Sequence, residues 1–237
     1  MRIAIVRLSA LGDIVNTAVV LQIIRSRYPY ARIDWLVEEA FGPILQNHPL
    51  IDSVIAVPIK RIKKTKSFTL LIHTVRTLRH LPPYDTVIDA QGLIKSAVVA
   101  RLLRGRIHGF DRNSAREGIA SRLYDTVSAI PYDENVVRRN VKVITEGLGI
   151  PYDEKLISEK QPIFPIGPKP EAFAENTKTI ACVIGASWPS KCYPKEHFAT
   201  VCSALPFPCH LIWGSDRERE DALWIAQHAS NAVVAPK

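Results

Sequence analysis

Short apolar runs alternate with amphipathic stretches of helical length from the first residues of the chain. Residues 2–7 have the composition of a buried strand, and residues 13–27 that of a helix with Ile14, Ala18 and Leu21 on one face. The same alternation predicts further strands at 33–38, 53–57, 86–89 and 106–110, and helices near 41–47, 93–103, 115–126 and 135–148. Strands that alternate with helices indicate βαβ units around a parallel sheet, and therefore an α/β fold.

The alternation stops between residues 158 and 178, where Pro162, Pro165, Pro168 and Pro170 occur in a segment without periodicity. We interpret residues 158–178 as a linker between two domains, 1–157 and 179–237. In the second domain the pattern predicts strands at 179–184, 210–213 and 232–235, and helices at 195–205 and 217–229. A doubly wound domain usually has about five or six strands. We therefore expect the second Rossmann-like domain to be incomplete at its C-terminus.

Composition and charge narrow the class of protein. Of 237 residues, 47% are hydrophobic and 23% are charged, which is typical of a globular chain. The sequence has no apolar run of about 18 residues, and its first apolar stretch is too short for a signal peptide, so we expect a cytoplasmic protein. The formal net charge of +8 favours an anionic partner, such as nucleic acid, an acidic membrane surface or a phosphorylated substrate.

The cysteines all lie in the last quarter of the chain, at positions 182, 192, 202 and 209. They form no C-x-x-C pair, and together with His197 and His210 they match no zinc-ligand spacing. We therefore expect ordinary reduced thiols and no metal site.

A single glycine, Gly12, lies in the turn between the first strand and the first helix, and Asp13 follows it. Glycine lets the backbone approach a ligand, and α/β folds bind their ligands at the carboxyl ends of the strands. The absence of a G-x-G-x-x-G motif disfavours a nucleotide-dependent oxidoreductase. Position alone leaves two interpretations of Asp13: a cap of the helix N-terminus, or a general base at the active edge of the sheet.

A basic segment without acidic residues follows the strand predicted at 53–57. Its basic residues are Lys60, Arg61, Lys63, Lys64, Lys66, Arg76 and Arg79. One interpretation is a solvated surface. The other is a binding surface for an anionic ligand, because charges of one sign repel one another unless a counter-charge is near. Residues 66–80 also have the pattern of an amphipathic segment that rests on a membrane, whereas no nucleic-acid-binding motif is recognised.

A second candidate turn follows the strand at 86–89. Asp89 ends that strand, and Gln91 and Gly92 lead into a helix that carries Lys95. A strand end, a glycine turn and a helix N-terminus together form a place for an anion. The alternative is that Asp89 only caps the helix and Lys95 is solvated.

A third candidate turn lies in the second domain. Gly185, Ala186 and Ser187 follow a strand, and Lys191 follows them, so that amides, a hydroxyl and a positive charge are available to a diphosphate. This motif is weak alone, because loops often contain serine and lysine. Residues 217–221, which include Glu218, have the pattern of a charged first helical turn.

Several sequence blocks resemble those of the lipopolysaccharide heptosyltransferases, and of the type I members in particular. The blocks are 7–15 (RLSALGDIV), 34–39 (DWLVEE), 87–96 (VIDAQGLIKS), 108–111 (HGFD) and 115–117 (ARE). They keep the order and approximate spacing of that family over essentially the whole chain. Several independent blocks in register are a stronger signal than any one of them.

The resemblance implies a GT-B fold, with two Rossmann-like domains, and an inverting transfer of heptose from ADP-heptose to a Kdo hydroxyl of Kdo-lipid A in inner-core synthesis. It implies that Asp13 is the catalytic base, a role compatible with capping. By the same resemblance the acceptor-binding residues are Arg7, Ser9, Lys60, Arg61, Lys63, Lys64, Gln91, Lys95 and Arg116. The donor-binding residues are Gly12, Ser187, Lys191 and Glu218. No metal or other cofactor is expected, and we expect a monomer in peripheral contact with the cytoplasmic face of the inner membrane.

One departure from the family leaves alternatives open. Family members continue past residue 237 through an Asp-Thr-Gly-x-x-His motif that binds the donor, and nothing in this sequence matches it. A catalytically incomplete fragment that only binds anionic lipopolysaccharide precursors is therefore one alternative. A type II heptosyltransferase, which acts on a heptose acceptor, is another.

Overall fold

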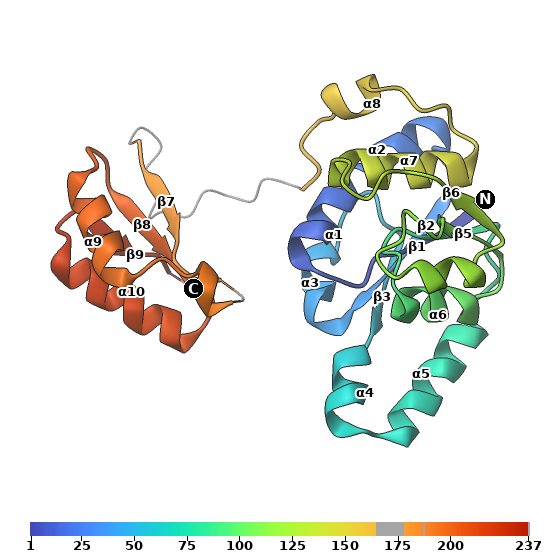
Figure 1. Ribbon diagram of the computed structural model, residues 1–237, viewed down its shortest axis with the longest axis horizontal. Helices are drawn as coiled ribbons and strands as arrows, with labels where there is room; N and C mark the ends of the chain where they lie inside the picture. The colour runs from blue at the N-terminus through green and yellow to red at the C-terminus, as the bar shows by residue number, and fades with distance from the viewer. Residues whose placement is uncertain (165–177, 187, 237) are drawn as a thin grey trace. The chain divides into compact units, whose positions relative to one another are not determined.

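The computed structural model describes residues 1–164, 178–186 and 188–236, and the chain divides into two compact units, Met1–Pro165 and Ile166–Lys237 (Figure 1). The predicted linker, 158–178, lies mostly outside the described residues. Both units consist of a parallel sheet with helices, so the predicted α/β fold with two Rossmann-like units is confirmed. No helix among the described residues has the length and apolar character needed to cross a membrane.

The first unit is built on a parallel sheet of six strands in the order β3-β2-β1-β4-β5-β6. The strands are β1 (Arg2–Val6), β2 (Arg32–Glu38), β3 (Ser53–Val57), β4 (Thr86–Asp89), β5 (Arg106–Phe110) and β6 (Thr126–Ser128). This is the doubly wound order, in which successive strands are added towards one edge of the sheet from β1 to β3 and towards the other edge from β4 to β6. The crevice at the carboxyl ends of those two strands is therefore the expected ligand site.

Helices cover both faces of this sheet. They are α1 (Leu11–Ala18), α2 (Val20–Arg27), α3 (Gly42–Leu45), α4 (Ile59–Thr65), α5 (Phe68–His80), α6 (Ile94–Leu102), α7 (Val136–Leu148) and α8 (Lys155–Ser158), with short 3-10 turns η1 (Glu39–Phe41) and η2 (Gly118–Leu123). The central strand β1 is buried on both sides: Ile3 and Ile5 pack in the core beneath α1, α2 and α7, and Ala4 and Val6 pack in the core beneath α5 and α6. Such continuous burial explains why β1 is apolar without alternation.

Two of the differences between the structure and the sequence prediction in this unit concern residues 13–27 and 115–126. The helix expected at 13–27 is two helices, and Thr17 donates its hydroxyl to the carbonyl oxygen of Asp13 at 2.7 Å, a back-bond that bends helices. The prediction of a helix at 115–126 is wrong, because this segment contains the short 3-10 turn η2 and the strand β6 begins at Thr126. Because β6 is only three residues long, its apolar pattern is too short to be recognised.

The second unit contains a parallel three-stranded sheet in the order β7-β8-β9. Its elements are β7 (Ile180–Val183), η3 (Pro189–Lys191), α9 (Lys195–Ala204), β8 (Cys209–Ile212), α10 (Asp216–His228) and β9 (Ala232–Val234). Leu211 at the centre of the sheet and Ala222 and Ile225 of α10 are fully buried in one core. Ser215 accepts a hydrogen bond from the Glu218 amide and so caps the N-terminus of α10.

Candidate functional site

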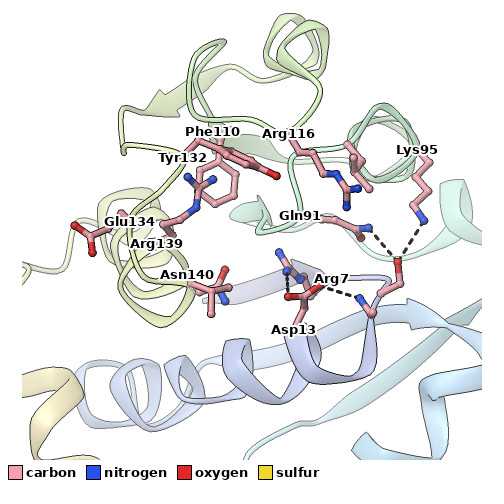
Figure 2. Close-up of a pocket in the computed structure, with 14 residues that line it drawn as sticks. Arg7, Asp13, Gln91, Lys95, Phe110, Arg116, Tyr132, Glu134, Arg139 and Asn140 are labelled. Carbon is pink, nitrogen blue, oxygen red and sulfur yellow. Dashed lines mark hydrogen bonds and ion pairs between the residues drawn. The ribbon is translucent and has the colours of Figure 1, made fainter. Parts of the chain in front are cut away.

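The candidate site of the first unit is a cavity of about 380 Å³ at the switch point of the sheet (Figure 2). Its walls come from the turn after β1, the turn after β4, the loop after β5 and the start of α7. The lining residues are Arg7, Ser9, Ala10, Asp13, Gln91, Leu93, Lys95, Phe110, Arg116, Tyr132, Glu134, Val136, Arg139 and Asn140. The cavity therefore gathers six of the sequence-predicted residues: Arg7, Ser9, Asp13, Gln91, Lys95 and Arg116.

Asp13 both stabilises its own helix and faces the cavity. One carboxylate oxygen accepts a hydrogen bond from the Ala10 amide at 3.1 Å, and the other lies 3.2 Å from an Nη atom of Arg7. Its side chain is still 42% exposed, so a ligand in the cavity has access to it. Asp13 can therefore cap the helix and act as a general base in the same conformation, because the cap uses one hydrogen bond and leaves the carboxylate accessible.

Arg7 connects the two turns of the switch point. Its guanidinium donates to the Ala90 carbonyl oxygen after β4 and pairs with Asp13 after β1. Burial lowers the pKa of Arg7, while the nearby carboxylates of Asp13 and Asp89 oppose this shift. A buried guanidinium fixed in this way holds the Asp13 carboxylate at one position in the cavity.

Ser9, Gln91 and Lys95 meet beside this ion pair, where the turns after β1 and β4 adjoin. Gln91 accepts a hydrogen bond from the Leu8 amide at 2.9 Å and donates to Ser9 Oγ at 3.2 Å, and Lys95 Nζ lies 3.3 Å from the same hydroxyl (Figure 2). Lys95 is exposed and Arg116 is exposed nearby, at the cavity rim. These two cations form no ion pair with a carboxylate among the described residues, so they are available to an anionic group.

Asp89 is fully buried directly beneath this wall. It accepts hydrogen bonds from the Gln91 and Gly92 amides at 2.8 and 3.3 Å, from Ser96 Oγ at 2.8 Å and from Tyr124 Oη at 2.7 Å. Burial raises the pKa of the Asp89 carboxyl, and the hydrogen bonds oppose this shift. Asp89 is not exposed to a ligand; instead it fixes the turn that carries Gln91.

Gly92 is required by this turn. Its φ is +68°, and a Cβ atom would lie 3.1 Å from Phe110 Cδ2 and 3.3 Å from Ala115 Cα. The positive φ favours glycine, and a Cβ atom would require Phe110 or Ala115 to move by a few tenths of an ångström. The glycine noticed in the sequence thus lets the Gln91 turn pack against the loop that carries Arg116.

Sequence reasoning missed the wall formed by α7 and the loop before it. Arg139 lies between two rings, with its Cζ atom 5.0 Å from the Phe110 centroid and 4.9 Å from the Tyr132 centroid. It donates to the carbonyl oxygens of Pro131 and Ser114 at 2.6 and 2.7 Å. The signal in the sequence was a pair of polar residues, Arg139 and Asn140, on the buried side of an amphipathic helix.

The basic segment forms α4 and α5, which follow β3, and neither helix lines this cavity. Its charge is partly compensated by acidic residues that follow β2: Arg61 lies 3.3 Å from Glu39, and the Lys60 amide donates to Glu38 at 3.1 Å. Lys63 and Lys64 are exposed and form no ion pair within the described part of the chain. Gly12 is exposed in the first turn of α1 and is not a lining residue either.

The second unit has a cavity of its own, of about 410 Å³, between the end of β7 and the start of α10. Glu218 lines it and accepts hydrogen bonds from the Gly214 and Ser215 amides at 2.7 and 2.9 Å, which lower the pKa of its carboxyl. Lys195 and Arg217, which the sequence did not single out, also line it. Lys191 is exposed in η3 and is not a lining residue, and Ser187 lies outside the described residues.

Gly185 makes room for Glu218. A Cβ atom on Gly185 would lie 1.9 Å from a carboxylate oxygen of Glu218 and 2.3 Å from its Cδ atom. A Cβ on Gly214 would lie no closer than 3.4 Å to the same side chain. The position of Glu218 therefore depends on the absence of a side chain at residue 185 in particular.

Three of the four cysteines are brought together, which the spacing did not predict. The Sγ atoms of Cys182, Cys202 and Cys209 all lie within 4.8 Å of one another, in the core of the second unit. Burial raises the pKa of the Cys202 thiol to about 12 and also raises that of Cys182. The cluster is enclosed by apolar side chains, so protonated thiols are its stable form at neutral pH.

Comparison with known proteins identifies the family of this chain. A model of glycosyltransferase family 9 (heptosyltransferase) matches residues 73–237. Lipopolysaccharide heptosyltransferase 1 of Campylobacter coli is 36% identical over all of this chain and 72% of its own length, and that of Pseudomonas aeruginosa is 31% identical over all of this chain and 68% of its own. The structure of E. coli heptosyltransferase WaaC with ADP-2-deoxy-2-fluoro heptose matches with a TM-score of 0.83 and 28% identity, over all of this chain and 76% of that one. This chain therefore belongs to glycosyltransferase family 9, the heptosyltransferases, whose members have the GT-B fold, and it is a glycosyltransferase.

Proposed function

We propose that this enzyme transfers L-glycero-D-manno-heptose from ADP-heptose to a Kdo hydroxyl of Kdo-lipid A, in the synthesis of the lipopolysaccharide inner core. The observation that carries the proposal is an accessible carboxylate, Asp13, in a cavity with cationic walls at the switch point of the first unit. The names of the relatives and the ADP-2-deoxy-2-fluoro heptose in the E. coli structure support the choice of donor. In this proposal the first unit binds the acceptor and the second unit binds the donor.

The reaction needs one displacement. Asp13 removes the proton from the acceptor hydroxyl, and the resulting oxygen attacks the anomeric carbon of the heptose from the face opposite the diphosphate. The new bond joins that oxygen to the anomeric carbon, and the bond to the diphosphate oxygen breaks, so ADP leaves with the electron pair and the anomeric configuration inverts. Lys95 and Arg116 provide positive charge for the anionic groups of the acceptor.

The second unit supplies the charge that the departing diphosphate requires. Arg217 lines the cavity of this unit and the N-terminus of α10 lies beside it, while Lys191 is exposed in η3 outside the cavity lining. We assign Glu218 to the ribose of the donor, because a carboxylate with a free lone pair accepts hydrogen bonds from sugar hydroxyls. These groups take the place of a metal ion in the proposed mechanism.

The proposed reaction is tested by incubating the protein with ADP-heptose and Kdo-lipid A and measuring the mass of the acceptor. We expect the acceptor to gain one heptose. A gain on an acceptor that already carries heptose, with none on Kdo-lipid A, would instead indicate a type II activity.

Gly185→Ala is expected to raise the donor KM by about 10- to 100-fold, because displacement of Glu218 removes a hydrogen bond to a charged group that contributes roughly 1.5–3 kcal/mol. The acceptor KM should be unchanged. Gly214→Ala is the matched control, since its Cβ has room, and it should leave the donor KM within a few-fold of wild type. Steady-state kinetics with each substrate varied in turn would measure both constants; equal effects of the two variants would contradict the assignment of Glu218.

We further propose that α4 and α5 contact the anionic surface of the membrane that contains the acceptor. Lys63 and Lys64 are exposed and unpaired within the described residues, and the apolar side chains of Phe68 and Leu71 on α5 are 72% and 41% exposed. Exposed apolar side chains beside lysines are the elements of an interfacial helix. The protein would thus reach a lipid-linked acceptor through peripheral contact with the membrane surface.

The double variant Lys63→Gln/Lys64→Gln is expected to bind phosphatidylglycerol vesicles about 30-fold more weakly, because each lysine near an anionic surface contributes about 1 kcal/mol. Vesicle sedimentation at low and high salt would measure this, and the difference from wild type should shrink at high salt. The matched control is Lys155→Gln/Lys160→Gln, which removes two exposed lysines from another part of the same unit. Equal weakening by both double variants would show that only net charge matters.

A further inference from the structure

Asn140 presents a buried amide without a hydrogen-bond partner at the wall of the cavity. It lies in α7, its side chain is 1% exposed, and its Nδ2 atom has no partner among the described residues. It is also one of the residues that line the cavity of the first unit. Figure 2 shows its side chain on the wall that faces Arg7 and Asp13.

A buried amide without a partner costs stability. Leaving such a donor unsatisfied costs roughly 1–3 kcal/mol, so buried polar groups in folded proteins are nearly all hydrogen-bonded. The neighbouring Arg139 shows the usual situation, since it donates to two backbone carbonyl oxygens. Within the described part of the chain, the Asn140 amide nitrogen has no such hydrogen bond to explain its presence on the buried side of the helix.

The chemistry of the cavity indicates what the amide binds. A neutral amide donates a hydrogen bond without adding charge, and a sugar hydroxyl can accept that bond while it donates its own proton to a carboxylate. The facing wall provides such a carboxylate in Asp13, and the cationic groups Lys95 and Arg116 lie elsewhere on the rim for anionic substituents. An amide on one wall and a carboxylate on the other are therefore complementary to a hydroxylated sugar.

We propose that Asn140 binds a hydroxyl group of the acceptor sugar and thereby fixes the orientation of that sugar relative to Asp13. This inference rests on the proposed function, since it assigns an additional binding residue to the same cavity. Asn140 is a positioning residue: it makes the cavity selective for a sugar that carries a hydroxyl at this point. A substrate without that hydroxyl leaves the amide unpaired, so the site should bind it much more weakly.

The test replaces the amide by an apolar group of similar size. For Asn140→Leu we expect the acceptor KM to rise at least about 10-fold, because the variant loses one hydrogen bond and leaves the sugar hydroxyl without its donor. The donor KM should stay unchanged. The melting temperature should be equal to that of wild type or higher, because the unpaired donor is removed. If Asn140 were merely structural, the melting temperature would fall and the kinetic constants of both substrates would change together.

The matched control is Thr145→Val on the same helix. Thr145 is also fully buried, but its hydroxyl donates to the Lys142 carbonyl oxygen at 3.1 Å and it does not line the cavity. We expect this variant to lower the melting temperature and to leave the acceptor KM near that of wild type. An effect on the acceptor KM equal to that of Asn140→Leu would overturn the proposal.

Acceptor binding without donor separates this inference from the proposed reaction. Titration calorimetry with the deacylated Kdo-lipid A saccharide should show binding by wild type and at least about 10-fold weaker binding by Asn140→Leu. If wild type transfers no heptose but binds the saccharide, and Asn140→Leu loses that binding, the Asn140 site would be supported and the transfer reaction refuted. Equal binding by both proteins, a change confined to the donor KM, or no binding by wild type would each overturn the inference.

Discussion

Asp13→Asn is expected to lower kcat by about 100- to 10,000-fold, the usual contribution of a general base. The amide occupies the same volume and its oxygen can still accept the Ala10 hydrogen bond that stabilises α1, but it cannot take a proton from the acceptor hydroxyl. The donor KM should change little, because the donor is assigned to the second unit. Heptose transfer followed by the mass of the acceptor would give kcat, and equilibrium binding of ADP would report on the donor site.

Glu134→Gln is the matched control for this prediction. Glu134 is the other carboxylate that lines the cavity, but it lies 3.4 Å from Arg138 and accepts a hydrogen bond from the Asn135 amide at 2.8 Å. We expect its replacement to change kcat by less than about 10-fold, since a residue outside the chemical step contributes only to binding and local structure. A large loss in Glu134→Gln with full activity in Asp13→Asn would move the base to the start of α7.

The loss of the Arg7 ion pair in Asp13→Asn is a separate effect that the experiment must allow for. Arg7 is buried, and removal of its carboxylate partner leaves its charge less compensated, so a decrease in stability is expected alongside the catalytic effect. The melting temperature of the variant therefore has to be measured. A variant that remains folded at the assay temperature and still turns over at the wild-type rate would refute the role of Asp13 as base.

The sequence predicted the residues of the two turns at the switch point because their positions follow from periodicity. β1 and β4 are apolar and are followed at once by polar turns, and parallel strands bring their carboxyl ends to one edge of the sheet. The sequence therefore indicated Asp13, Gln91 and Lys95 as candidates on two separate turns, and the pairing of β1 with β4 brings those turns to one cavity. The resemblance to heptosyltransferases then indicated which chemistry these residues serve.

The wall formed by α7 could not be predicted in the same way. Its placement depends on β6, a strand of three residues whose pattern is too short to detect, and the segment before it was wrongly expected to be a helix. Without β6, nothing in the sequence placed the start of α7 at the carboxyl edge of the sheet. Arg139 and Asn140 therefore read as ordinary residues of an amphipathic helix.

Contacts between side chains that are distant in the sequence were also beyond prediction. The proximity of Cys182, Cys202 and Cys209 follows from the parallel pairing of β7 with β8 and from the packing of α9 against them. The ion pair between Arg61 and Glu39 joins α4 to the turn after β2, although the basic segment itself contains no acidic residue. In both cases the spacing along the chain carries no information about the distance in space.

Asp89→Ala is expected to destabilise the first unit by at least about 3 kcal/mol. The buried hydroxyls of Ser96 and Tyr124 and the amides of the Gln91 turn lose their acceptor, and each unsatisfied group costs roughly 1–3 kcal/mol. For a unit of this size the melting temperature should fall by about 6–12 °C. The acceptor KM should rise as well, since Gln91 and Lys95 are positioned by this turn. Thermal unfolding followed by circular dichroism would measure the first effect, and acceptor kinetics below the melting temperature the second.

Asp89→Asn separates the hydrogen bonds from the charge. Its oxygen retains the backbone amides and its nitrogen can donate to the hydroxyls, so we expect a smaller loss of stability than for Asp89→Ala. Burial raises the pKa of Asp89 in the folded state, which means that ionisation of this residue lowers stability as the pH rises from the unfolded pKa through the folded one. The asparagine variant does not ionise, so its deficit relative to wild type should shrink as the pH increases through that range. Asp125→Ala is the control. It removes an exposed carboxylate whose partners among the described residues are the Ile107 amide and the exposed Arg101, so it should change the melting temperature far less. Equal shifts in Asp89→Ala and Asp125→Ala would show that the buried network contributes no special stability.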